Sequence, residues 1–146
     1  MPLALPALTS GLQSCFASPP ATRLACARAW ADAAVAYATG IAPPSTTVTT
    51  AGDALAAALS SAFDSPNSAP AMESAFAQFA ATVGLGMAGF LPTPPVAPVG
   101  FAPQFAGPKP ATHADAAQQI GGLIDTWIRT GFSTLAAPPG TVVPWS

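Results

Sequence analysis

The stretch LQSCFASP at residues 12–19 recurs as LSSAFDSP at residues 59–66, with five of the eight positions identical. Repetition of a segment along a chain is the sequence signature of an internal repeat. We interpret the two stretches as equivalent parts of a duplicated unit, because an apolar segment with helical periodicity follows each of them. The sequence therefore predicts two tandem helical hairpins, spanning residues 6–43 and 51–92.

The order of residues after each copy supports this duplication. An aromatic residue, Trp30 in the first hairpin and Phe79 in the second, lies ten residues before a glycine, Gly40 or Gly89. The second hairpin has apolar residues spaced to lie on one face of a helix. Shifted by 49 residues, their positions match apolar positions of the first hairpin, except at the first one. The aromatic residues predicted to anchor the core are Trp30, Tyr37, Phe63, Phe76, Phe79 and, in a later helix, Trp127.

The remaining segments complete a single all-α domain over residues 1–146. Residues 91–110 contain seven prolines, which argue against a helix and predict an extended, proline-rich strap. The pattern THAD that follows is a capping box, so we expect a fifth helix over residues 112–133. Residues 138–146 are predicted to form an extended tail.

The strap and the tail are both rich in apolar side chains. Such side chains would be costly to leave in water, so they predict packing against another surface. We expect the strap to lie over helices of its own chain or of a neighbour, and the tryptophan of the tail to insert into an adjacent subunit. The candidate assembly contacts are Phe101, Phe105, Val143 and Trp145.

Charged residues are scarce in this chain. They make up 7% of it, whereas soluble domains average about 25%, and hydrophobic residues make up 51%. A surface so poor in charge predicts that other subunits or a membrane cover much of the exterior. Four basic residues against six acidic ones leave no patch able to neutralise a run of phosphates, so we expect no nucleic acid partner.

Cys15 and Cys26 are the two cysteines, and ten residues separate them. This spacing matches neither a CxxC redox pair nor a zinc knuckle. Because they flank the predicted turn of the first hairpin, a disulfide between its two helices is conceivable. The alternative, which we favour because the second hairpin has Ala62 in place of Cys15, is that both pack as small buried hydrophobic residues.

The sequence has no constellation typical of catalysis or of cofactor binding. GxSxG, HExxH and phosphate-loop motifs are absent, and Gly84, Gly86 and Gly89 close a helix where a nucleotide-binding loop would open one. His113, the only histidine, lies in the first turn of a predicted helix, where the helix dipole disfavours a positive charge. We therefore expect a non-enzymatic protein without a metal or a cofactor.

Residues 74–91 keep a membrane-active role open as an alternative. This segment is 18 residues long and mostly apolar, near the lower limit for a spanning helix. Gln78 and three glycines dilute its hydrophobicity, and no Lys or Arg flanks it to set an orientation. A small lytic or pore-forming protein is thus one alternative, and a soluble helical adaptor is another, although the low charge argues against the adaptor.

Five stretches distributed over the chain carry a resemblance to a known class of proteins. They are AWA at 29–31 with the helix continuing to Tyr37, PPVAPVGF at 94–101, PATHA at 110–114, IDTW at 124–127 and VPWS at 143–146. In these stretches the chain resembles small alanine-rich helical proteins encoded among the structural genes of tailed bacteriophages. The resemblance implies a virion component, assembled in the host cytoplasm, whose partners are other virion proteins or copies of itself. It implies no choice among capsid, neck, tail and baseplate.

Overall fold

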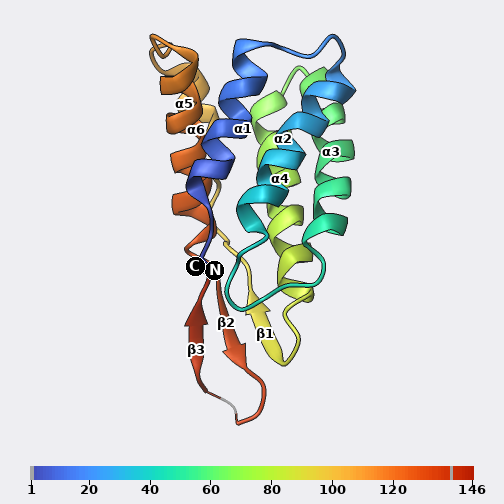
Figure 1. The fold of residues 1–146 in the computed structure, drawn as a ribbon, viewed down its shortest axis with the longest axis vertical. Coiled ribbons are helices and arrows are strands. Elements are labelled where there is room, and N and C mark those ends of the chain that lie inside the picture. Colours follow the sequence, from blue (N-terminus) through green and yellow to red (C-terminus); the bar gives the residue numbers. More distant parts are fainter. Residues whose placement is uncertain (1, 139) are drawn as a thin grey trace.

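The computed structural model describes residues 2–138 and 140–146, which form a helical bundle with a small antiparallel sheet at one end (Figure 1). The helices of this described part are α1 (Leu5–Ala17), α2 (Arg23–Ala38), α3 (Val48–Asp64), α4 (Ser68–Leu85), α5 (Phe101–Ala106) and α6 (His113–Ile128). The strands are β1 (Phe90–Thr93), β2 (Phe132–Leu135) and β3 (Val142–Pro144), in the order β1-β2-β3. The chain is therefore mostly helical, as predicted, but it is not purely α.

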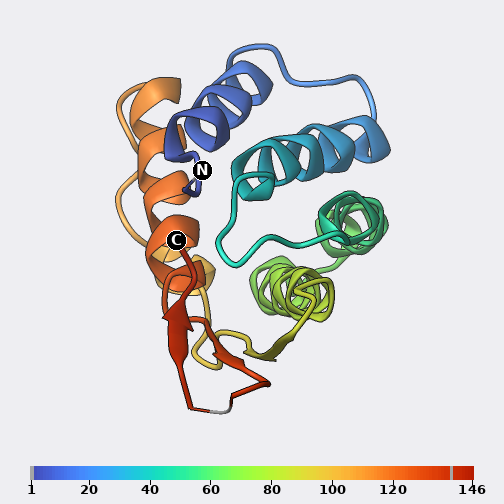
Figure 2. The same ribbon diagram turned by 60° about the horizontal axis from the view of Figure 1, so that its bottom comes forward.

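The five long helices pack side by side. Each helix from α1 to α3 packs against the next one in the chain, and α6 packs against α1. Figure 2 shows the resulting order α6, α1, α2, α3 and α4 around the bundle. Short connections between successive helices favour antiparallel neighbours, which is the arrangement of α1 to α4. The short helix α5 packs against α4.

Small residues allow these helices to approach closely. A Cβ added at Gly11 of α1 would lie 2.6 Å from Cβ of Ala33 on α2. One added at Gly52 of α3 would lie 2.2 Å from Cγ2 of Val35 on the same helix α2. Both distances are far below van der Waals contact, so the tight packing of α2 depends on the missing side chains. The alanines that α2 buries are Ala27, Ala31, Ala33, Ala34 and Ala38.

Replacing Gly52 by alanine is expected to lower the free energy of unfolding by about 1–3 kcal/mol, because the added methyl group pushes α3 away from α2. Gly122→Ala is the matched control, since Gly122 also lies inside a helix but has nothing within 4 Å of its Cβ position. There the substitution should stabilise the protein by up to about 1 kcal/mol through helix propensity alone. Urea unfolding measures both changes. Equal effects of the two substitutions would contradict the close packing of α2 on α3.

The start of the second helix differs from the prediction. Ser18 followed by Pro19 has the pattern of a helix start and predicts a cap at Ser18. In the structure α2 begins only after Thr22, whose hydroxyl oxygen accepts a backbone N–H in the first turn. Pro19 is followed by Pro20, and a residue before proline is disfavoured in the helical region. The two prolines therefore delay the helix.

The other two predicted caps have different outcomes. The pattern TAGD at residues 50–53 also predicts a capping box. Thr50 instead lies inside α3 and caps nothing, and Asp53 forms an ion pair with Arg28 (2.9 Å). The capping box that opens α6 is confirmed, because the Thr112 hydroxyl oxygen accepts the backbone N–H of Asp115 (3.0 Å).

The proline-rich segment and the tail contain regular structure that the sequence did not predict. Residues 91–110 supply most of β1 and the short helix α5. Pro103 fits α5 because it lies in the first turn, where a backbone N–H has no partner within the helix. Segments after α6, including the predicted tail, form β2 and β3. These strands have only three or four residues, too few for an alternating pattern to be recognised. They are stable because they pair with one another, and a sequence pattern does not show that pairing.

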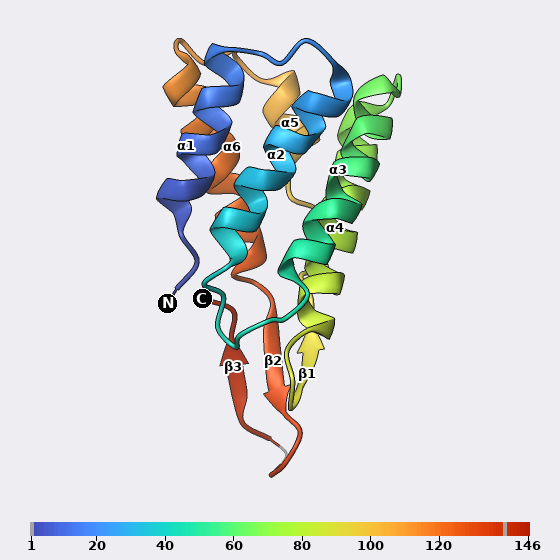
Figure 3. The same cartoon turned by 45° about the vertical axis from the view of Figure 1, so that its right-hand side comes forward.

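The register of the sheet places alternate residues on two different faces. Leu91 of β1 lies opposite Thr134 of β2, which lies opposite Val142 of β3. Ser133 is fully buried and marks the inner face, so its neighbours along β2 point outward. Figures 1 and 3 show the β2–β3 hairpin projecting beyond the end of the helices.

One carboxylate holds the proline-rich segment on α4. The side chain of Glu73 accepts the backbone N–H groups of Val99 (2.5 Å), Gly100 (2.8 Å) and Phe101 (2.7 Å). Gly100 has a φ of +105°, a left-handed conformation that favours glycine. Such a turn lets successive N–H groups converge on one anion, so Glu73 fixes the start of α5.

Candidate interaction surface

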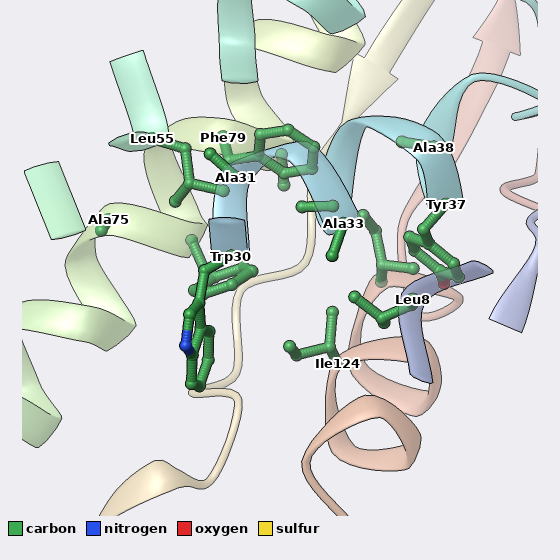
Figure 4. Close-up of a cluster of buried hydrophobic side chains, with 14 of the residues drawn as sticks. Leu8, Trp30, Ala31, Ala33, Tyr37, Ala38, Leu55, Ala75, Phe79 and Ile124 are labelled. Carbon is green, nitrogen blue, oxygen red and sulfur yellow. The ribbon is translucent and has the colours of Figure 1, made fainter. Parts of the chain in front are cut away.

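The aromatic residues predicted as core anchors lie within the helical bundle. Trp30 lies between Phe16 and Phe63, with ring centroids 5.8 Å and 5.9 Å away. Phe16 and Phe63 hold the same position in the two similar stretches, so matching residues of α1 and α3 contact Trp30. Figure 4 shows Trp30, Tyr37 and Phe79 in this cluster of buried side chains. The buried anchors are Trp30, Tyr37, Phe76, Phe79 and Trp127, whereas Phe63 is half-buried.

Two of these anchors also make polar contacts. The Tyr37 hydroxyl donates to Oδ1 of Asp125 (2.8 Å), which also accepts from Nε of Arg129 (2.9 Å). Burial, and then the hydrogen bond to Asp125, raise the pKa of Tyr37 well above its ordinary value. The indole N–H of Trp127 donates to the carbonyl oxygen of Ala97 (2.5 Å). We interpret both contacts as structural links, of α2 to α6 and of α6 to the proline-rich segment.

Two of the four candidate assembly contacts are buried inside their own chain. Phe101 is fully buried, with its ring centroid 5.4 Å from that of Phe76. Trp145 is only 1% exposed. The prediction that these two side chains contact a neighbouring subunit is therefore wrong. The strap and the tail are apolar at these positions because they complete the core of this chain.

The indole of Trp145 fills a slot at the sheet end of the bundle. Its N–H donates to Oγ of Ser133 (2.8 Å), and that hydroxyl donates to Sδ of Met87 (3.1 Å). A Cβ added at Gly131 would lie 2.6 Å from the indole, and one added at Gly84 would lie 3.2 Å from it. The two glycines therefore leave the room that the indole occupies.

The other two candidate contacts differ in exposure. Phe105 is 47% exposed, and its ring stacks on that of Phe101 with 5.8 Å between centroids. Val143 lies opposite Ser133 in the sheet, so its half-buried side chain belongs to the inner face. Phe105 is thus accessible to a partner, whereas Val143 packs mainly within the chain.

The opposite side of the sheet is an exposed surface without charge. The outer sheet face consists of the residues that point away from Ser133: Leu91, Thr93, Phe132, Thr134, Val142 and Pro144. Leu91 is 63% exposed, Val142 56% and Phe132 37%. None of the three strands contains an ionisable residue. Sequence reasoning named none of these positions, because three or four residues are too few for the alternation of a strand to be recognised.

Proline restricts the free edge of β3. The backbone N–H of Leu135 donates to the carbonyl oxygen of Thr141 (2.8 Å), so Thr141 directs its backbone groups towards β2. In an antiparallel ladder, successive residues direct their backbone N–H and C=O groups to opposite sides of the strand. The backbone groups of Val142 and Pro144 therefore face the open edge. Since proline has no N–H, Val142 supplies the single donor of this edge within β3.

The free edge of β1 is blocked in the same way. The N–H of Ala136 donates to the carbonyl oxygen of Gly89 (3.0 Å), so Gly89 directs its backbone groups towards β2. By the same alternation, the backbone groups of Phe90 and Pro92 face the open edge. The N–H of Phe90 already donates to the carbonyl oxygen of Met87 (3.1 Å), and Pro92 has none. Natural sheets use such prolines to prevent pairing with further strands. The sheet is therefore open to contact through its face and closed to extension at its edges.

The charged side chains lie away from this face. Arg28 pairs with Asp53 (2.9 Å), Arg129 pairs with Asp125 (2.9 Å), and Arg23 pairs with Asp64. All six residues lie on helices or at helix ends. The pairs Arg28–Asp53 and Arg23–Asp64 are exposed and add at most about 1 kcal/mol each to stability, whereas the Asp125 side chain is mostly buried. Neither these six residues nor Lys109, in the connection between α5 and α6, lies in the strands of the sheet.

The residues with potential for chemistry do not form a site. His113 is exposed in the first turn of α6. Across residues 2–138 and 140–146, no group of three or more His, Cys, Asp or Glu side chains is placed to hold a metal ion. The Sγ atoms of Cys15 and Cys26 lie 3.7 Å apart, without a disulfide between them. Of the helices in the described part of the chain, none combines the length and the apolar character needed to cross a membrane.

Comparisons with known proteins find no match for this chain among protein-family models, curated proteins or solved structures. Function must therefore be argued from the composition of the chain and from the surface described above.

Proposed function

We propose that this chain is a non-enzymatic structural subunit of a larger assembly, of the kind found in the virions of tailed phages. The observation that carries the proposal is the outer sheet face, which exposes Leu91, Phe132 and Val142 and carries no charge. A contiguous apolar surface on a protein of low charge is typical of a contact between subunits. The neighbour docks on the face of the sheet, because prolines close both of its edges.

The small size of this face argues for an assembly held by many weak contacts. Three short strands, spaced about 4.8 Å apart with about 3.3 Å per residue, present roughly 200 Å² on one side. Stable pairwise interfaces bury about 800 Å² on each partner. One such contact is therefore weak, and it becomes effective when many copies repeat it or when other surfaces join in. Further exposed apolar residues that can join in are Leu24, Leu85 and Phe105.

The proposal includes an origin of the bundle by duplication of one helical hairpin. The support is the similarity of residues 12–19 to 59–66 and the equal spacing from Trp30 to Gly40 and from Phe79 to Gly89. In this view residues 91–110 act as a strap that lies on the second hairpin, where Glu73 binds it.

Mass spectrometry of particles purified through a density gradient tests the assignment to a virion directly. We expect the chain to copurify with the particles at a fixed copy number. Its absence from the particles, or its sedimentation with lipid vesicles, would contradict the proposal.

Val142→Lys is expected to reduce incorporation into particles by about tenfold or more, because an unpaired ammonium group would be buried in an apolar contact. Val96→Lys is the matched control, since Val96 is 95% exposed and lies outside the sheet. Quantitative mass spectrometry of particles measures incorporation, and circular dichroism checks that both variants remain folded. Equal incorporation of the two variants would rule out docking through the outer sheet face.

A further inference from the structure

The two thiols of the protein lie next to each other on neighbouring helices. Cys15 is near the end of α1 and Cys26 is in the first turns of α2, and their Sγ atoms are 3.7 Å apart. Neither Asp, Glu nor His completes a metal site around them within the described residues. The pair therefore has the composition of a redox site.

The surroundings of the pair allow the two sulfur atoms to approach each other. A disulfide requires a separation of about 2.05 Å, which each sulfur can reach by a movement of less than about 1 Å. Beside the thiols lies an open apolar pocket of about 370 Å³, lined by Cys15, Phe16, Pro19, Cys26, Trp30 and Phe63. Cys15 is buried, whereas Cys26 is partly exposed and can be reached from solvent.

We propose that Cys15 and Cys26 form a reversible disulfide that links α1 to α2 when the protein meets an oxidising thiol–disulfide couple. The function of this bond is to prevent the first helix from separating from the bundle. The inference concerns the isolated chain and does not depend on the structural role proposed above.

The bond forms by two successive exchange reactions with a low-molecular-weight disulfide such as oxidised glutathione. The Cys26 thiolate first attacks one sulfur of glutathione disulfide, which releases one glutathione thiolate and leaves a mixed disulfide. The Cys15 thiolate then attacks the Cys26 sulfur and releases the second glutathione. The two thiols lose two protons and two electrons in total, and glutathione disulfide takes them up to give two molecules of reduced glutathione.

Burial controls the rate of the second step. It raises the pKa of Cys15 to about 11, with smaller contributions from the hydrogen bond and the charge of Cys26. At neutral pH little Cys15 is therefore present as thiolate, so ring closure is slow and becomes faster as the pH rises. Slow closure means that brief exposure to the oxidant stops at the mixed disulfide of Cys26, whereas longer exposure closes the internal bond.

The expected consequence is a more stable first hairpin. The bond closes a loop between residues 11 positions apart, which restricts the unfolded chain. For a loop of this size the unfolding equilibrium constant should fall on the order of 100-fold. Dithiothreitol should restore the original value.

The test uses the purified full chain incubated with oxidised glutathione, followed by trapping with iodoacetamide, intact-mass measurement and urea unfolding. We expect a monomer that has lost the mass of two hydrogens, carries no alkyl group and unfolds at a higher urea concentration. Cys26→Ser is the control, since it keeps the size of a partly exposed side chain but cannot form the bond. It should show no gain in stability under the same treatment.

Three outcomes would overturn the proposal. The first is persistence of the glutathione adduct on the wild-type chain after prolonged incubation at raised pH, without closure to the internal bond. The second is formation of the internal bond with no change in the unfolding equilibrium. The third is an equal gain in stability for Cys26→Ser. A second control variant, Cys26→Ala, replaces Cys26→Ser if the serine substitution prevents folding.

Discussion

Replacing Trp145 by alanine is expected to lower the free energy of unfolding by about 3–5 kcal/mol, the range measured for large aromatic residues removed from cores. The indole is 1% exposed and fits between Gly84 and Gly131, so its loss leaves a cavity. The buried Ser133 hydroxyl also loses the hydrogen bond that it accepts from the indole N–H and keeps only its donation to Met87, which adds to the loss of stability. Urea unfolding followed by circular dichroism measures the change without relying on tryptophan fluorescence.

Two further variants make this test specific. Val142→Ala changes an exposed residue of β3, the strand that precedes Trp145, so its effect should stay within about 0.5 kcal/mol. Gly131→Ala places a methyl group 2.6 Å from the indole and should destabilise the protein by obstructing the slot from the other side. If Trp145→Ala were no more destabilising than Val142→Ala, the tail would not be part of the core.

The burial of Trp145 also affects how the proposed assembly contact can be tested. Deleting residues 142–146 removes a core side chain together with an exposed surface, so loss of incorporation after deletion could result from unfolding alone. The Ser146 backbone is also paired with Ala42, whose N–H donates to the Ser146 carbonyl oxygen (2.9 Å). Single substitutions on the outer sheet face separate the two effects, because these side chains contribute little to the core.

Replacing Glu73 by alanine should lower the free energy of unfolding by about 3 kcal/mol. The carboxylate accepts three backbone N–H groups, and hydrogen bonds to a charged group contribute more than neutral ones. Without it, the N–H groups of Val99, Gly100 and Phe101 lose their partner in a partly buried position. Hydrogen exchange of these three amides should become faster, and urea unfolding should show the loss of stability.

Asp32→Ala is the control for removal of one negative charge. Its carboxylate is exposed and lies 3.9 Å from Arg28, too far for a strong ion pair. Glu73→Gln should give an intermediate loss, since an amide oxygen still accepts hydrogen bonds but carries no charge. A loss from Glu73→Ala no greater than that from Asp32→Ala would contradict the role of Glu73 in fixing the strap.

Local patterns in the sequence were sufficient to predict most of the helical bundle. The apolar stripes around Trp30 and Phe79 identified the buried faces of α2 and α4, because a helix repeats every 3.6 residues and its pattern lies within one segment. The capping box at Thr112 identified the start of α6 for the same reason. By contrast, the prolines after Ser18 moved the start of α2 beyond the predicted position.

Only the tertiary structure decided which apolar side chains became core and which became surface. Trp145 and Val142 are both apolar residues of one short tail, yet the register of β3 on β2 directs one inward and leaves the other exposed. That register depends on pairing with residues of other segments, and a shift by one residue would exchange the two faces. The sequence by itself thus determined the helices and the scarcity of charge. The contacts between distant segments determined where the uncharged outer sheet face lies.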